Sequence, residues 1–448
     1  MRLRWFHTES TLKMYFNNIS GRVVALVLVV TLLTACGGGD GSTPAPSLPA
    51  LNVLPSPDPR IAKNVLPVTV DAGPADTGRN VNRLYADVTV CEPGSITRCQ
   101  TIKHVLVDTG STGLRLLSSV MADELNLPQV KADGGVPLLN CVQFIDFTSA
   151  WGPVAAADIW LGGMKAASVP MQVIADPALN SLSPHQCSGP AFTPITSARM
   201  LGGNGIIGLG LFKEDCGSRC TSIADNGFYY TCTDTSCTST TGAKASILQQ
   251  LKNPISRFEE HSNGVVIELP PVRPPGTASL SGTAVFGIGT HSTNNKLAGA
   301  TILRTDADGY ITTLLGTQSL GISFLDTGSN GLYFYSDAIR RCGAAAPGFY
   351  CPDFSQPFGA KLVGARGEVS PHIPFSIDNA LDLFANGAHA VLPTLGGNIC
   401  DANRIDRDCH VTSAFTFDWG LPFFYGRRVF FGIEGLTPSV ATGSFYAF

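Results

Sequence analysis

Two aspartates in nearly identical surroundings are the residues of this chain best suited to catalysis. The segment Val105–Leu114 (VLVDTGSTGL) is repeated 218 positions later as Ser323–Leu332 (SFLDTGSNGL). Two carboxyl groups a few ångströms apart cannot both ionise, so they share one proton and can accept and donate protons in a single reaction. Asp108 and Asp326 are therefore candidates for acid–base chemistry, provided that the fold brings them together.

A second pair of landmarks follows the two motifs at similar spacing. Ile206-Ile207-Gly208 lies about a hundred residues after Asp108, and Asp418-Trp419-Gly420 lies slightly fewer than that after Asp326. A single Asp-Thr-Gly-Ser sequence is a common turn composition. Two copies with matched landmarks instead indicate that one structural unit has been duplicated.

The elements that must position these motifs are expected to be mostly β-strands. Short runs rich in Val, Ile, Leu, Phe and Thr alternate with clusters of Gly, Pro, Asn and Asp, which is typical of strands and turns. The predicted strands include Leu84–Val90, Val105–Val107, Ile159–Leu161, Gly264–Leu269 and Val429–Ile433. The predicted helices are few and short: Ser118–Leu127, Ser246–Leu251 and Asp378–Phe384.

The paired motifs resemble those of the pepsin-like aspartic peptidases, in which each lobe carries an Asp-Thr-Gly-Ser/Thr loop and a later apolar-apolar-Gly element. Asn204–Gly210 matches that element, Trp419–Tyr425 matches it loosely, and Ala284–Gly289 is similar to the strand that opens the second lobe. Together with the N-terminus, the chain looks most like uncharacterised bacterial lipoproteins that carry this doublet. The resemblance implies an all-β, minor α, bilobal fold with a cleft between two β-barrel lobes, at residues 65–283 and 284–448.

The same resemblance implies a mechanism. One carboxyl of the Asp108/Asp326 pair would take a proton from a water molecule while the other donates a proton to the carbonyl oxygen of a peptide bond, and the pair would titrate as a unit. The neighbouring residues would support the pair by tight turns, by hydrogen bonds between the lobes and by hydrogen bonds to the outer carboxyl oxygens. They are Thr109, Gly110, Ser111, Thr327, Gly328 and Ser329.

The chain departs from the pepsin-like pattern in three respects. The stretch that corresponds to the flap, Cys141–Trp151, contains no Tyr, so Phe144, Phe147 or Trp151 would have to cover the cleft. Arg115 stands where an aromatic residue is usual, seven positions after the first aspartate, and would alter the hydrogen bonding near the flap. Residues 37–64 are too short to resemble an inhibitory pro-segment.

The N-terminus has the features of an export signal. Arg2, Arg4, Lys13 and Arg22 precede the apolar run Val23–Leu33, and Leu33-Thr34-Ala35-Cys36 resembles a bacterial lipobox. We expect residues 1–35 to be a lipoprotein signal peptide, Cys36 to carry the lipid, and residues 36–64 to be a flexible Gly/Pro-rich tether. A membrane anchor, or a start at Met14, is the alternative. The predicted location is the bacterial cell envelope, with the outer membrane favoured because Gly37 follows Cys36.

Cysteine parity agrees with export to an oxidising compartment. The chain has 13 cysteines, and if Cys36 carries the lipid, an even number of 12 is left to form disulfides. Three pairs close in sequence and one more distant pair are predicted to be bonded: Cys91–Cys99, Cys342–Cys351, Cys400–Cys409 and Cys141–Cys187. Cys216, Cys220, Cys232 and Cys237 allow three pairings, and four thiolates at this spacing could instead bind zinc.

Composition and missing motifs exclude several functions. A net charge of −4, with no basic block after the first 22 residues, argues against nucleic-acid binding. The sequence contains no Gly-x-Ser-x-Gly, His-Glu-x-x-His or phosphate-binding loop, so we expect no cofactor and no catalytic metal. Two hypotheses remain. The first is a cell-envelope aspartic endopeptidase acting on peptide or protein substrates. The second is a catalytically silent lipoprotein that binds a peptide, a glycan or a partner protein.

Overall fold

A computed structural model describes residues 51, 54, 61–189, 192–233, 237–399, 415–437, 441 and 443–448. The described residues belong to one compact unit. The predicted signal peptide, the lipidation site Cys36, most of the predicted tether and the predicted Cys400–Cys409 pair lie outside the described residues. Among those described, no helix is long and apolar enough to cross a membrane.

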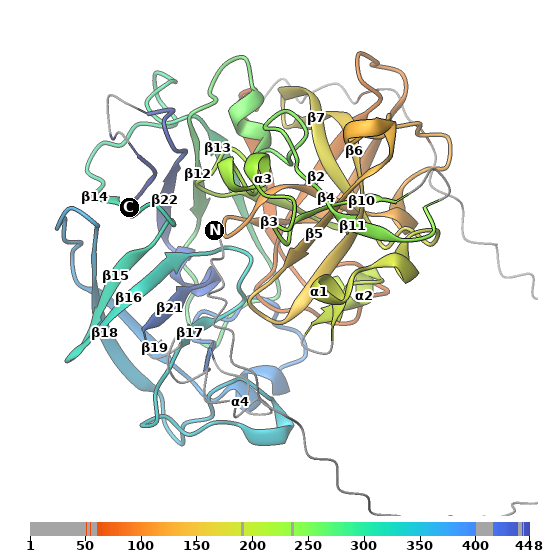
Figure 1. The fold of residues 1–448 in the computed structure, drawn as a ribbon. Helices are drawn as coiled ribbons and strands as arrows, with labels where there is room; N and C mark the ends of the chain where they lie inside the picture. Colours follow the sequence, from red (N-terminus) through yellow and green to blue (C-terminus); the bar gives the residue numbers. More distant parts are fainter. Residues whose placement is uncertain are drawn as a thin grey trace, which may run out of the picture. The chain divides into compact units, whose positions relative to one another are not determined.

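The described structure is mostly β, with few and short helices, which confirms the predicted class (Figure 1). One large sheet contains the strands of the N-terminal half and part of the C-terminal half. Its strands are β1 (Val65–Val70), β2 (Leu84–Cys91), β3 (Cys99–Asp108), β4 (Thr112–Leu117), β5 (Leu138–Gln143), β6 (Thr148–Leu161), β7 (Met164–Ile174), β8 (Thr193–Pro194), β9 (Gly205–Leu209), β10 (Tyr229–Cys232), β11 (Thr240–Gly242), β12 (Gly264–Leu269), β13 (Leu280–Phe286), β14 (Ile302–Arg304), β22 (Arg427–Gly432) and β23 (Phe445–Ala447).

A second, smaller sheet belongs to the C-terminal half. Its strands are β15 (Ile311–Leu315), β16 (Gln318–Leu325), β17 (Leu332–Phe334), β18 (Gln356–Val363), β19 (Ile373–Ile377), β20 (Gly396–Gly397) and β21 (Thr416–Trp419). The α-helices are α1 (His185–Ser188), α2 (Ala198–Leu201), α3 (Ser218–Ser222) and α4 (Ala380–Ala385). Short 3₁₀ helices are η1 (Ser118–Val120), η2 (Asp133–Gly135), η3 (Asn180–Leu182), η4 (Pro254–Arg257), η5 (Gly343–Ala345) and η6 (Leu421–Phe424).

Part of the large sheet closes on itself. Strands β2, β3, β9, β4, β7 and β6 pair in that order, and β6 pairs back with β2, which makes a barrel-like ring. Closure removes free strand edges from this part of the sheet. The sheet continues from β2 through β1, β13 and β12 to β22, so its hydrogen bonds run from the N-terminal half into the C-terminal half. The predicted boundary between residues 283 and 284 falls inside β13.

The repeat in sequence is also a repeat in strand pairing. In the N-terminal half, β9 lies between β3, to which it is parallel, and β4, to which it is antiparallel. In the C-terminal half, β21 lies between β16 and β17 with the same two orientations. Each aspartate therefore ends or follows a strand that is paired to the second landmark of its own half.

The cores behind these strands differ in composition. Aliphatic side chains such as Val105, Leu114 and Ile207 fill the core of the first half. In the second half, the Phe417 ring stacks on Phe334 and on Trp419, with ring centroids 4.9 and 4.0 Å apart. Because β21 is fully buried in this aromatic cluster, its position relative to the second aspartate is tightly constrained.

Two predicted helices do not form. Ser118–Leu127 has only the short η1, because tertiary contacts replace helical bonds: Ala122 N–H donates to Gln100 Oε1 and Asn126 N–H donates to Glu92 Oε1. Ser246–Leu251 forms only turns, and its Leu251 N–H donates to the Tyr229 hydroxyl. The third predicted helix is confirmed as α4.

Five disulfides lie among the described residues. The predicted Cys91–Cys99, Cys342–Cys351 and Cys141–Cys187 bonds are confirmed. The four clustered cysteines pair as Cys216–Cys220 and Cys232–Cys237, so the alternative zinc site is wrong, because bonded sulfurs offer no thiolates.

Candidate active site

The two aspartates lie at equivalent places in the two halves. Asp108 is the last residue of β3 and pairs with Gly208 of β9, and Asp326 directly follows β16, whose Leu325 pairs with Trp419 of β21. Both side chains are largely buried, each with 7% of its surface exposed. The strand ends therefore bring together residues that are far apart in sequence.

One backbone group binds both carboxyls. The Gly110 N–H donates to Asp108 Oδ1 at 2.8 Å and to Asp326 Oδ1 at 3.1 Å. On the other loop, the Gly328 N–H donates to Asp326 Oδ1 at 2.7 Å. A Cβ added to Gly110 would lie 2.7 Å from Asp326 Cγ, and one added to Gly328 would lie 2.7 Å from Asp108 Oδ1. Both loops require glycine here because each backbone approaches the opposite carboxyl.

The two threonines link the loops reciprocally. Thr109 N–H donates to Thr327 Oγ1 at 3.1 Å, and Thr327 N–H donates to Thr109 Oγ1 at 2.9 Å. Each hydroxyl also donates to a carbonyl of the opposite half, Thr109 to Leu325 O and Thr327 to Val107 O. Because both threonines are buried, these bonds fix the separation of the two aspartates.

The outer carboxyl oxygens accept hydrogen bonds from the serines. The Ser111 hydroxyl lies 2.5 Å from Asp108 Oδ2, and the Ser329 hydroxyl lies 3.0 Å from Asp326 Oδ2. All eight residues singled out in the two Asp-Thr-Gly-Ser motifs thus meet in one cluster. Four N–H and O–H donors orient the two carboxyls with their inner oxygens beside each other.

The surroundings of the pair favour a protonated carboxyl. Burial raises the pKa of Asp326 to about 8, and the negative charge of Asp108 and a hydrogen bond with it act in the same direction. The Gly328 N–H and the Ser329 hydroxyl oppose the shift in the pKa of Asp326 but do not cancel it. The arrangement can therefore hold one proton between the two carboxyls at neutral pH.

Comparison with known protein families identifies the family of this chain. Residues 60–448 match the family described as "Protein of unknown function (DUF3443)". This chain belongs to the DUF3443 family. No curated protein matches the sequence. The match includes both aspartates and all of the described strands of this DUF3443 protein.

The three predicted flap residues, Phe144, Phe147 and Trp151, pack against other parts of the first half. The stretch Cys141–Trp151 forms the end of the β5–β6 hairpin, with paired strand residues on both sides of a turn at residues 144–147. Trp151 is buried, with its ring 5.5 Å from Tyr230 and its Nε1 donating to Leu179 O, so it packs in the core of the hairpin. Phe144 packs against a core cluster, and Phe147 contacts Phe192. The charge of Asp146, at the tip of this turn, acts on Tyr333 of β17.

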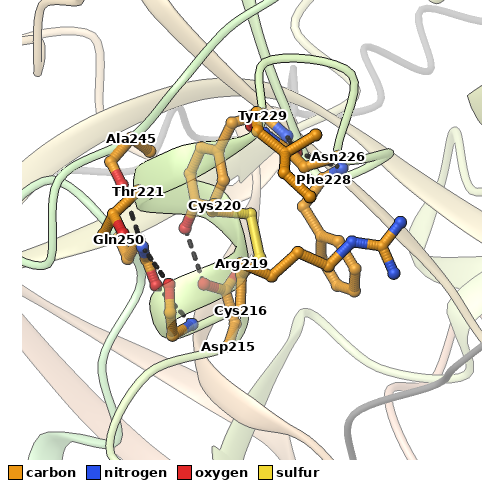
Figure 2. The surroundings of a disulfide bond; sticks show 12 residues. Asp215, Cys216, Arg219, Cys220, Thr221, Asn226, Phe228, Tyr229, Ala245 and Gln250 are labelled. Carbon is orange, nitrogen blue, oxygen red and sulfur yellow. Dashed lines mark hydrogen bonds between the residues drawn. A yellow bond between two sulfur atoms is a disulfide. The ribbon is translucent and has the colours of Figure 1, made fainter.

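Arg115 is part of a buried ionic cluster. Its side chain is 1% exposed; one guanidinium nitrogen donates to Thr112 O and another lies 3.7 Å from Asp215 Oδ2. The Tyr229 hydroxyl donates to Asp215 Oδ1 at 2.7 Å, beside the Cys216–Cys220 disulfide (Figure 2). Burial raises the pKa of Asp215 to about 6 despite the opposing charge of Arg115. The Arg115 charge is therefore partly neutralised within the core of the first half.

Sequence reasoning missed three residues near the pair. The Arg83 guanidinium donates to Gly328 O at 2.9 Å, and the Asn82 amide donates to Asn330 O at 2.8 Å, so the segment before β2 holds the second loop. The third is Asp418, whose Oδ2 lies 2.5 Å from the Ser329 hydroxyl oxygen. An acidic residue in the second landmark, where the first half has Ile206, was the available signal for Asp418. No sequence signal marked Asn82 or Arg83.

The part of the chain that the structure describes contains no group of three His, Cys, Asp or Glu residues arranged to hold a metal ion. The candidate site consists of carboxyl, hydroxyl and backbone groups. Such a set suits proton transfer to and from a bound water molecule.

Proposed function

We propose that this protein is an aspartic endopeptidase of the pepsin-like type, acting in the bacterial cell envelope. The observation that carries the proposal is the single Gly110 N–H that donates to both Asp108 Oδ1 and Asp326 Oδ1. A surface or purely structural role does not need two carboxyls in contact, since burying them raises the energy of the folded state. The duplicated β3–β9–β4 and β16–β21–β17 arrangements support a bilobal, pepsin-like architecture.

The proposed reaction is the direct hydrolysis of a peptide bond by water. The ionised carboxyl of the pair removes a proton from a bound water, whose oxygen forms a bond to the peptide carbon, while the protonated carboxyl donates its proton to the carbonyl oxygen. One hydroxyl of the resulting gem-diol gives a proton to the ionised carboxyl, while the protonated carboxyl donates its proton to the nitrogen. The carbon–nitrogen bond then breaks, releasing a carboxyl and an amine, and the pair holds one proton as it did at the start.

The proposed location follows from the N-terminal sequence. A lipid on Cys36 would anchor the protein to a membrane, with the outer membrane favoured, and substrates would be peptides or proteins of the periplasm or the cell surface. The confirmed disulfides support an oxidising compartment.

A silent binding module is the second candidate, and one observation favours it. Trp151 is committed to the core of the β5–β6 hairpin, and the flap has no Tyr to close over a substrate. On this alternative, the carboxyl pair would be a remnant and the protein would bind peptides, glycans or a partner without cleaving them.

Cleavage assays with paired variants distinguish the two candidates. The purified full-length protein is incubated with a denatured protein from pH 3 to 7, and the cleavage products are mapped. We expect Asp108→Asn and Asp326→Asn each to reduce the cleavage rate by at least about 100-fold, the scale of acid–base catalysis. Asp353→Asn is the matched control, because its side chain is 74% exposed. Absence of cleavage by folded wild type, or equal cleavage by the Asp108 and Asp326 variants, would favour the binding module.

A further inference from the structure

A third carboxyl lies directly behind the pair, on the C-terminal side only. Asp418 is on β21, where it pairs with Phe324 of β16 and Tyr333 of β17, and it is 2% exposed. Its Oδ2 is 2.5 Å from Ser329 Oγ, which is itself 3.0 Å from Asp326 Oδ2. The residue in the same register of the first half is Ile206, opposite Leu106, so Asp108 has no such neighbour.

The number of protons shared by Asp418, Ser329 and Asp326 restricts which of the two carboxyls can be ionised. The Ser329 hydroxyl has one proton and can donate it to only one of the two carboxyls that flank it. Both contacts are hydrogen bonds only if one carboxyl is protonated and donates to Ser329 Oγ. Asp418 Oδ1 is buried and has no hydrogen-bond partner in the described part of the chain, which a neutral acid tolerates far better than a carboxylate does.

The surroundings of Asp418 favour its neutral form. Burial raises the pKa of Asp418 well above its ordinary value, and the charges of Asp326 and Asp108 raise it further. On β17 the facing titratable group is Tyr333, whose pKa is also raised by burial. The nearby cation Arg83 binds Gly328 O, and Asp418 forms no ion pair with any described residue.

We propose that Asp418 is a positioning residue that stays protonated and donates its O–H to Ser329, so that Ser329 directs its own O–H to the outer oxygen of Asp326. Hydrogen bonds in such a chain polarise and strengthen one another. A donor on the ionised form of a carboxyl lowers its pKa. The relay therefore stabilises the ionised form of Asp326. Its catalytic consequence rests on the proposed peptidase function, whereas the protonation of Asp418 does not.

Two substitutions of Asp418 distinguish its role as a hydrogen-bond donor to Ser329 from a role in packing. Asp418→Asn keeps a donor for Ser329 and cannot ionise, and Asp418→Leu keeps a similar branched shape without any donor. We expect the pH profile of kcat/KM of Asp418→Asn to match that of wild type. We expect the profile of Asp418→Leu to move to higher pH by about half a unit or more, a threefold change in proton affinity. A structural role alone would lower activity at every pH without moving the profile.

A titration without substrate tests the relay independently of peptidase activity. Full-length protein with ¹³C-labelled aspartate carboxyls is titrated from pH 4 to 9 by NMR, and Asp418→Asn and Asp326→Asn assign the two resonances. We expect the Asp418 carboxyl to remain protonated at pH 7, and the Asp326 titration to move upward in Asp418→Leu but not in Asp418→Asn. An Asp418 carboxyl that ionises in its ordinary acidic range overturns the relay, as do pH profiles that coincide in all three active proteins. A wild type that cleaves nothing while Asp418 stays protonated overturns only the peptidase proposal.

Discussion

At the scale of single residues, the candidate site depends on two glycines, because the absence of a side chain lets each loop approach the opposite carboxyl. Gly110 and Gly328 each face the aspartate of the opposite half, where even a methyl group would contact a carboxyl. Neither glycine has a positive φ, so the requirement for glycine is set by space and not by backbone conformation. Each carboxyl is thus packed against the opposite loop with no space for a Cβ.

Replacing these glycines should impair the pair without unfolding the protein. A Cβ 2.7 Å from a carboxyl must displace it, and displacements of about 1 Å can cost about 100-fold in rate. We therefore expect Gly110→Ala and Gly328→Ala to reduce kcat/KM about 100-fold while the protein still folds, with a loss of about 1–3 kcal/mol in unfolding free energy from overpacking. Gly321→Ala on β16 is the control, because a Cβ there would contact nothing within 4 Å. Full activity in Gly110→Ala would contradict the close approach of the two loops.

The buried Arg115 allows a test of stability at the same scale. Arg115→Met leaves Asp215 buried beside Tyr229 without its cation, and breaking such a pair costs about 3–5 kcal/mol. We expect this loss of unfolding free energy in denaturant titrations at pH 8, where Asp215 is mostly ionised. The double variant Arg115→Met/Asp215→Asn should recover much of the loss. A double variant as unstable as the single one would show that Arg115 acts by packing alone.

At the scale of elements, matched strand triplets place the two motifs. Strand β3 ends at Asp108 and β16 ends directly before Asp326, and β9 and β21 lie beside them in the same parallel orientation. The second triplet is held by stacked aromatic rings, and the β5–β6 hairpin of the first half is tied to α1 by Cys141–Cys187. The hairpin that corresponds to the flap is therefore covalently linked to α1.

Removing disulfides should destabilise the protein according to the loops that they close. Cys141–Cys187 spans 46 residues and Cys216–Cys220 spans 4. Loop-closure entropy assigns about 4 kcal/mol to the first and about 2 kcal/mol to the second. We expect paired Cys→Ala variants to lose unfolding free energy in that order, as measured by urea denaturation. The reverse order would mean that native-state packing around α3 outweighs the entropy of the unfolded chain.

At the scale of the whole molecule, buried acids make stability depend on pH. Burial raises the pKa of Asp215 to about 6 and of Asp326 to about 8, while an ion pair and hydrogen bonds lower the pKa of Asp158. A carboxyl whose pKa is raised by folding binds its proton more tightly in the folded state than in the unfolded state. Its contribution to stability is fully present below its unfolded pKa and is lost as pH rises through its folded pKa. Asp158 acts oppositely, and its contribution is lost only in acid.

The melting temperature should therefore be highest in mild acid. We expect it to decline from about pH 5 to pH 8, because Asp215 and then Asp326 lose protons that the folded state favours. Asp326→Asn should flatten the decline between pH 6 and 8, and the exposed Asp353→Asn should not. The measurement is thermal unfolding monitored by circular dichroism across this range. Equal slopes in wild type and Asp326→Asn would show that Asp326 titrates normally.

Much of this arrangement was predictable from sequence, because it is encoded locally or by repetition. Alternating apolar residues and turn residues predict strands, and two Asp-Thr-Gly-Ser motifs with matched landmarks predict two related halves. Close cysteine spacing predicted the short disulfides. The helices expected at Ser118–Leu127 and Ser246–Leu251 failed, because side chains distant in sequence bind their backbone groups.

Only the tertiary structure decided which groups surround the carboxyl pair. Ser329 and Asp418 are 89 residues apart, and they meet because β21 inserts between β16 and β17. Tertiary packing likewise brings the Arg83 guanidinium to Gly328 O and Asp215 to Arg115. Such contacts depend on how strands pack and not on local patterns. The sequence by itself therefore determined the two aspartates and their turns, and packing between distant strands decided the hydrogen bonds and burial that set their protonation.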